Sequence, residues 1–141
     1  EIGGSLRVFS AREGLKNVNT KTWEILHRLE LKDKADVPST NLAHGDQRLL
    51  EVAMALAGDP KILFLDEPTA GMSPAETEHI AQLIKGLTDT IAVVLVEHDM
   101  DVVMTISDEI TVLDQGRIIA EGSPRTIQDN ELVKEAYLGH G

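Results

Sequence analysis

The sequence predicts an α/β fold in which helices cover a parallel β-sheet. Two apolar runs, Ile62 to Leu65 and Ile91 to Val96, are continuous and do not alternate with polar residues. Such runs are typical of strands that are buried on both faces. Each run is followed by a segment with helical spacing, and this alternation accompanies parallel sheets. We therefore expect two interior strands of one sheet.

Two helices are predicted before the first strand. Residues 1 to 20 are rich in Gly, Asn and Ser, carry a few basic residues, and predict an irregular stretch. Residues 21 to 31 predict an amphipathic helix, because their apolar residues recur at helical spacing. These residues are Trp23, Ile25, Leu26, Leu29 and Leu31. A polar segment and a turn centred on Gly45 then lead into a second helix, from Asp46 to Ala57.

A third and a fourth helix are predicted after the two strands. Ser73 and Pro74 form a helix start, with Ser at the cap and Pro at the first helical position, and this helix should run to about Leu87. Residues 100 to 107 predict the fourth helix.

The C-terminal part predicts an antiparallel hairpin followed by two short helices. Glu109 to Leu113 and Arg117 to Glu121 flank a turn that contains Gly116. Ser123 and Pro124 open the first of the two helices. The hairpin is expected to lie at the edge of the fold.

The composition excludes several classes of protein. The 141 residues carry a net charge of −11, which disfavours direct binding to nucleic acid and to anionic lipid. No apolar segment reaches the roughly 18 residues that a membrane-spanning helix needs. There is no cysteine, so disulfides and thiolate metal sites are excluded, and a soluble cytosolic protein is the expectation.

Charged residues follow both predicted strands. Asp66 and Glu67 end the first strand, and Glu97, His98 and Asp99 end the second. Because ligands of open α/β sheets bind at the carboxyl ends of the strands, these groups are expected to face one site. The simpler interpretation is that the acidic residues merely cap a strand-to-helix connection and that His98 is solvated.

A further candidate site is the segment from residue 42 to residue 48. Its Gly45 lies next to a predicted helix start, where free backbone N–H groups and the helix dipole favour an anion. Taken alone, the segment is better explained by a simple glycine turn. A phosphate-binding loop of the form GxxxxGK followed by Ser or Thr is missing from these 141 residues. We therefore expect the chain to be part of a larger protein.

Four motifs, in order, resemble those of ABC-type ATPases. The segment from residue 42 to residue 48 is similar to the signature motif of that family, and we call it the signature segment. The run ILFLDEP is similar to the family's Walker B strand. Thr69 to Ser73 falls at the position of the D-loop and His98 at that of the switch histidine. The resemblance covers roughly residues 20 to 141. It implies an incomplete P-loop NTPase fold: residues 1–45 from the helical subdomain, and residues 46–141 from a RecA-like parallel sheet core with flanking helices.

The resemblance also implies roles for individual residues toward ATP and Mg²⁺. Asp66 would hold Mg²⁺, Glu67 would act as the general base on the attacking water, and His98 would contact the γ-phosphate. The remaining nucleotide contacts would come from two loops. They are Ala43, His44, Gly45 and Asp46 of the signature segment, and Gly71 and Ser73 of the D-loop.

The chain departs from the family pattern at four of these positions. Ala43, His44 and Asp46 replace the usual Ser, Gly and Gln, and Ser73 replaces the usual Asp. Asp46 would place a carboxylate near a triphosphate, and the sequence alone does not explain how that repulsion is relieved. These departures concern the contacts of the signature segment rather than the fold.

The resemblance is greatest to the ATPase subunits of branched-chain amino-acid importers. It rests on QRLLEVAMALA, DEPTAGMSPAE, VEHDM, EGSP and EAYLG. It implies a second ATPase subunit and membrane permease subunits as partners, and a position on the cytoplasmic face of the membrane. Because the phosphate-binding loop is missing, the isolated chain is expected to be inactive, and uncovered apolar sheet surface predicts that it self-associates. The alternatives are a urea-type importer ATPase and a non-catalytic dimerisation module, the latter favoured if no phosphate-binding loop precedes the chain. An ABC ATPase of chromosome maintenance or translation is disfavoured by the net charge.

Overall fold

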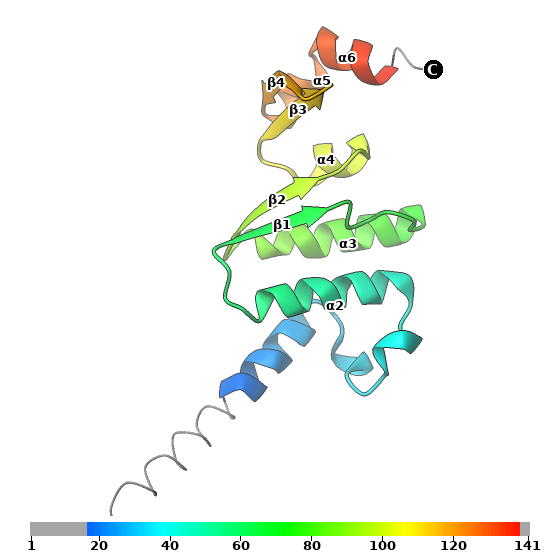
Figure 1. Cartoon of the computed structure of the whole chain (residues 1–141), viewed down its shortest axis with the longest axis vertical. Helices are drawn as coiled ribbons and strands as arrows, with labels where there is room; N and C mark the ends of the chain where they lie inside the picture. Colours follow the sequence, from blue (N-terminus) through cyan, green and yellow to red (C-terminus); the bar gives the residue numbers. More distant parts are fainter. Residues whose placement is uncertain (1–16, 139–141) are drawn as a thin grey trace, which may run out of the picture. The chain divides into compact units, whose positions relative to one another are not determined.

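The computed structural model describes residues 17–138 (Figure 1). The chain divides into two compact units. The first unit contains the described chain up to Leu63 together with residues 89–94. The second contains residues 64–88 and the chain from Leu95 onward. Most of the predicted irregular stretch lies outside the described residues. Its last part, residues 17–20, is helical, so the prediction is wrong there.

The first helix of the first unit ends earlier than predicted. Residues 17–28 are helical, and Glu30 then adopts a left-handed backbone with φ of 57°. The N–H groups of Glu30 and Leu31 donate to carbonyls of the last turn, as in a Schellman motif. Glycine usually occupies this position, so the sequence did not signal the end. Leu31 is buried, whereas Trp23, another apolar residue of the predicted amphipathic pattern, is 47% exposed.

Helix α2 (His44–Leu56) carries the signature segment into the first unit. Two short 3₁₀ turns, η1 (Lys32–Lys34) and η2 (Ser39–Asn41), precede it in the predicted polar segment. The helix buries one face, as expected from its pattern. The buried residues are Gly45, Leu49, Val52, Ala53 and Leu56. Because α2 begins two residues before Asp46, Gly45 lies inside its first turn, which corrects the predicted turn.

Strands β1 (Ile62–Asp66) and β2 (Ala92–Val96) pair with each other. The Ala92 N–H donates to the Lys61 carbonyl, and the Glu67 N–H donates to the Val96 carbonyl. Both partners advance together along the chain, so the pair is parallel, as predicted and as the arrows in Figure 1 show.

The prediction that both strands are buried on both faces is wrong. Their side chains alternate between exposed and less exposed positions. The exposed apolar residues are Ile62, Phe64, Val94 and Val96. An apolar run is sufficient to form a strand, but burial of its second face requires a covering element, and the described residues supply none.

Helices α3 (Pro74–Leu87) and α4 (Met100–Ile106) of the second unit match their predictions and contact each other. Ser73 caps α3, and Asp99 caps α4. No helix in the described part of the chain is long and apolar enough to cross a membrane.

The remainder of the second unit is the predicted hairpin and two short helices. Strands β3 (Ile110–Asp114) and β4 (Arg117–Gly122) pair in antiparallel orientation across a two-residue turn. Helices α5 (Pro124–Gln128) and α6 (Glu131–Leu138) pack against β4. The apolar core that these elements share contains Ile110, Val112, Ile127 and Val133.

Candidate functional site

Glu67 occupies the first position after β1, where the chain leaves the sheet. Its φ of 43° lies in the left-handed region, which is uncommon for a residue other than glycine and costs on the order of 1 kcal/mol. The hydrogen bond from its N–H to the Val96 carbonyl, at 2.9 Å, holds it against β2. Strained backbone of this kind concentrates at functional sites.

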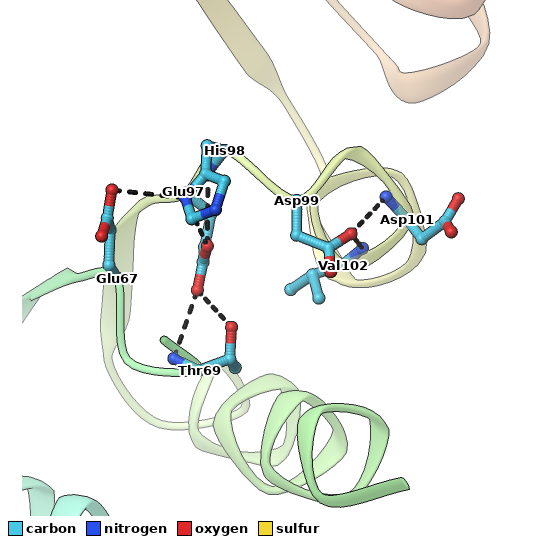
Figure 2. A network of polar contacts seen from close by, with 7 residues as sticks. All are labelled: Glu67, Thr69, Glu97, His98, Asp99, Asp101 and Val102. Carbon is cyan, nitrogen blue, oxygen red and sulfur yellow. Dashed lines mark hydrogen bonds and ion pairs between the residues drawn. The ribbon is translucent and has the colours of Figure 1, made fainter. Parts of the chain in front are cut away.

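His98 follows β2 and meets Glu67. The His98 Nδ1 lies 3.3 Å from the Glu67 Oε1, and both side chains are exposed, at 71% and 50% (Figure 2). The predicted meeting of a carboxylate and an imidazole at the strand ends is therefore confirmed. An exposed carboxylate can orient or deprotonate a water, and an imidazole N–H can donate to an anionic oxygen.

Glu97, between β2 and His98, is a buried carboxylate that the sequence analysis did not assign to a role. Its side chain is 1% exposed. The Oε1 accepts hydrogen bonds from the Thr69 Oγ1 at 2.5 Å and the Thr69 N–H at 3.3 Å, and the Oε2 accepts one from the His98 N–H at 3.3 Å (Figure 2). We call Glu67, Thr69, Glu97 and His98 the strand-end cluster. A carboxylate directly after an apolar run was the available signal, but its partner is 28 residues away.

Asp99 fixes the chain on the other side of His98. Its Oδ1 accepts hydrogen bonds from the N–H groups of Asp101 and Val102, at 3.0 and 3.3 Å, and so caps α4 (Figure 2). Since α4 begins directly after the cap, His98 is confined to a short connection between β2 and a helix.

Asp66 is the last residue of β1 and is exposed. The described residues contain no cluster of three His, Cys, Asp or Glu side chains that could hold a metal ion. A Mg²⁺ that accompanies a nucleotide takes one or two carboxylates and completes its coordination with phosphates and water. The carboxylate of Asp66, next to Glu67, therefore fits such an ion as its protein ligand.

The turn after β1 contains the two predicted D-loop contacts. Gly71 has a φ of 78°, which favours glycine. Ser73 forms a capping box with Glu76: its Oγ accepts from the Glu76 N–H at 3.4 Å, and its N–H donates to the Glu76 Oε2 at 2.9 Å. The Ser73 Oγ also donates to the same Oε2 at 2.6 Å. The predicted helix start is confirmed, and the hydroxyl of Ser73 is engaged in the cap.

The signature segment forms the N-terminus of α2 in the first unit. Ala43 is the N-cap residue and makes no side-chain cap hydrogen bond. His44, Gly45 and Asp46 are the first three helical residues, whose N–H groups have no partner within the helix itself. The Gln47 side chain donates to the carbonyls of Ser39 and Leu42, both at 3.2 Å, and so holds the preceding turn in place.

Asp46 is paired with a lysine that the sequence analysis did not assign. The Lys34 Nζ lies 2.5 Å from the Asp46 Oδ1, and the Asp46 side chain is 17% exposed. Lys34 is the last residue of η1, so a 3₁₀ turn brings its charge to the start of α2. The positive charge of Lys34 offsets the negative charge that Asp46 adds to the signature segment. The sequence alone did not explain how the repulsion between Asp46 and a triphosphate would be relieved.

Two family profiles match the chain. The profile described as "ABC transporter" matches residues 4–70, which include the signature segment and β1. A second, described as "Branched-chain amino acid ATP-binding cassette transporter", matches residues 117–141. The chain belongs to the ABC transporter family of ATP-binding proteins.

Relatives of this ABC family include two that serve branched-chain amino-acid transport. The high-affinity branched-chain amino acid transport ATP-binding protein LivG of Escherichia coli K12 is 46% identical over 120 residues, which make up 84% of this chain and 46% of LivG. BraF of Pseudomonas aeruginosa, which has the same description, is 45% identical over 116 residues, covering 81% of this chain and 46% of BraF. The chain thus spans about half the length of these relatives.

The fold agrees with that of solved ABC ATPases. The ADP conformation of an ATP-binding cassette of an ABC transporter matches with a TM-score of 0.77 and 30% identity. The match covers 87% of this chain and 50% of that chain. The fold class predicted from the sequence, a partial P-loop NTPase, is therefore confirmed.

Proposed function

We propose that the chain is part of an ATP-hydrolysing subunit of an ABC importer for branched-chain amino acids. The single observation that carries the ATPase proposal is the 3.3 Å approach of Glu67 and His98 at the ends of two parallel strands. The importer type and the solute are supported by the likeness to LivG and BraF.

In this proposal Glu67 orients and deprotonates the attacking water. Its carboxylate is 50% exposed beside His98, and its backbone is held by the hydrogen bond to Val96. His98 donates a hydrogen bond to the γ-phosphate and keeps that group beside Glu67. Such positioning and charge compensation account for most of the catalysis of phosphoryl transfer. Mg²⁺, held by Asp66, would neutralise phosphate charge.

The signature segment and the turn before α3 are proposed to supply the remaining contacts to the nucleotide. His44, Gly45 and Asp46 would face the triphosphate through the first turn of α2 and Ala43 as the residue directly before it, with Lys34 offsetting the charge of Asp46. Gly71 and Ser73 would contribute through the turn before α3. In the family, the signature motif acts on a nucleotide held by a second ATPase subunit, so we propose a dimer as the active form.

The same proposal assigns the two parts of the chain to different subdomains. Residues 1–45 would belong to the helical subdomain that docks on membrane permease subunits, and residues 46–141 to the ATPase core. The protein would lie on the cytoplasmic face of the membrane. Because the phosphate-binding loop is missing from these 141 residues, the chain alone should not hydrolyse ATP.

The test compares ATP binding and turnover by the full-length gene product and by the 141-residue chain. We expect Mg²⁺-dependent turnover by the full-length protein only, and a loss of roughly a hundredfold to ten-thousandfold in Glu67→Gln with nucleotide binding retained. Full turnover in Glu67→Gln would remove Glu67 as the base. A full-length protein that dimerises but neither binds nor hydrolyses ATP would favour the non-catalytic module.

A further inference from the structure

Glu97 is a charged group that the proposed reaction does not use. A buried carboxylate is unfavourable unless hydrogen bonds compensate for its lost hydration. The 1% exposed side chain of Glu97 obtains that compensation from two separate loops. One oxygen accepts from Thr69, in the turn after β1, and the other accepts from the His98 N–H after β2 (Figure 2).

Thr69 and Glu67 belong to the same tight turn, so the position of Thr69 affects that of Glu67. Thr69 lies two residues after Glu67 in this turn, where the Ala70 N–H donates to the Glu67 carbonyl at 3.1 Å. Thr69 is itself buried, with 6% of its surface exposed. Since Glu67 holds a left-handed backbone, its conformation depends on restraints from its surroundings. The position of Thr69 is one such restraint.

We propose that Glu97 is a positioning residue that holds Glu67 and His98 at their mutual distance through its bonds to Thr69 and His98. Its contacts join the loops that carry the two reacting groups, and hydrogen bonds to a carboxylate are about twice as strong as those between neutral groups. Glu97 does not touch the nucleotide. The inference rests on the proposed ATPase function.

The test uses conservative substitutions in the full-length gene product. Thr69→Val removes the hydroxyl but keeps the shape, and Glu97→Gln removes the negative charge and replaces one of the two acceptor oxygens by an NH2 donor. We expect each to lower kcat by about tenfold to a hundredfold, since small misplacements of reacting groups have effects of this size. The KM for ATP should change less than about twofold, because binding contacts are retained. Thr69→Ser keeps the hydroxyl and should therefore have the kcat of the wild type.

A matched control is available in the same unit. Thr111 donates to the Glu121 Oε1 at 3.1 Å across β3 and β4, and both residues are exposed. Thr111→Val and Glu121→Gln remove a Thr–Glu bond of the same kind away from the strand-end cluster, so they should leave kcat unchanged. Within the cluster, the double substitution Thr69→Val with Glu97→Gln should lower kcat by less than the product of the two single effects, because the two residues share one hydrogen bond.

A second readout does not depend on activity. Hydrogen–deuterium exchange of the full-length protein should show that Thr69→Val speeds exchange both in the turn at residues 68–72 and at the His98 amide. Exchange confined to the mutated turn would overturn the inference, as would a kcat within twofold of wild type in Thr69→Val, whatever happens to thermal stability. If Glu67→Gln abolishes turnover while Thr69→Val is silent in both readouts, the ATPase proposal stands and the positioning role fails.

Discussion

Replacement of Ser73 by alanine should measure how strongly the turn after β1 depends on its capping box. The Ser73 Oγ makes a short 2.6 Å bond to the Glu76 carboxylate and accepts a longer 3.4 Å bond from the Glu76 N–H. Ser73→Ala removes both but leaves the bond from the Ser73 N–H to Glu76. Loss of an N-cap side chain lowers the free energy of unfolding by about 0.5 to 2 kcal/mol. Because this capping box includes a charge-assisted bond, we expect Ser73→Ala to cost about 1 to 2 kcal/mol.

Ser123 provides the comparison. It caps α5 through a single backbone bond, from the Thr126 N–H at 3.4 Å, together with a contact to the Thr126 hydroxyl. Ser123→Ala should therefore cost about 0.5 to 1 kcal/mol. The assay is urea unfolding of each variant, monitored by far-ultraviolet circular dichroism. The free energies of unfolding are compared between variants whose dependence on urea concentration has the same slope. A cost for Ser73→Ala equal to or below that of Ser123→Ala would refute the capping-box reasoning.

Three further predictions concern the remaining parts of the chain. Lys34→Met should weaken ATP-dependent dimerisation of the full-length protein, because it leaves the charge of Asp46 unpaired. Adding Asp46→Asn should relieve that defect. Additive effects of the two substitutions would contradict charge compensation. Ile127→Ala should destabilise the chain by about 2 to 5 kcal/mol in urea unfolding, because Ile127 is fully buried in the core shared by the hairpin and the last helices. The isolated chain should self-associate through its exposed strand face, and Phe64→Lys should reduce this association; a monomeric wild type in light scattering at micromolar concentration would contradict it.

Local signals in the sequence were sufficient for most elements. The strands follow from continuous apolar runs, and the start of α3 follows from Ser73 and Pro74, because a cap and its helix are neighbours in sequence. The meeting of Glu67 and His98 could also be predicted, since parallel strands end at one edge of a sheet. Helix ends were less certain: Glu30 ends a helix in a conformation that glycine usually supplies.

Contacts between distant segments were not predictable from these patterns. The hydrogen bond between Thr69 and Glu97 spans 28 residues, and the ion pair of Lys34 with Asp46 joins a 3₁₀ turn to a helix 12 residues away. Both depend on how loops are placed, which no periodicity encodes. Burial of the strands was predicted wrongly for a related reason: Phe64 is as apolar as a core residue, yet its exposure is decided by what covers it.

The most direct test of the account is a crystal structure of the full-length Glu67→Gln variant with ATP and Mg²⁺. The account predicts the γ-phosphate at about 3 Å from the His98 imidazole, the hydrogen-bonding distance, with a water beside the substituted side chain at the end of β1. A γ-phosphate bound away from the ends of β1 and β2 would contradict it.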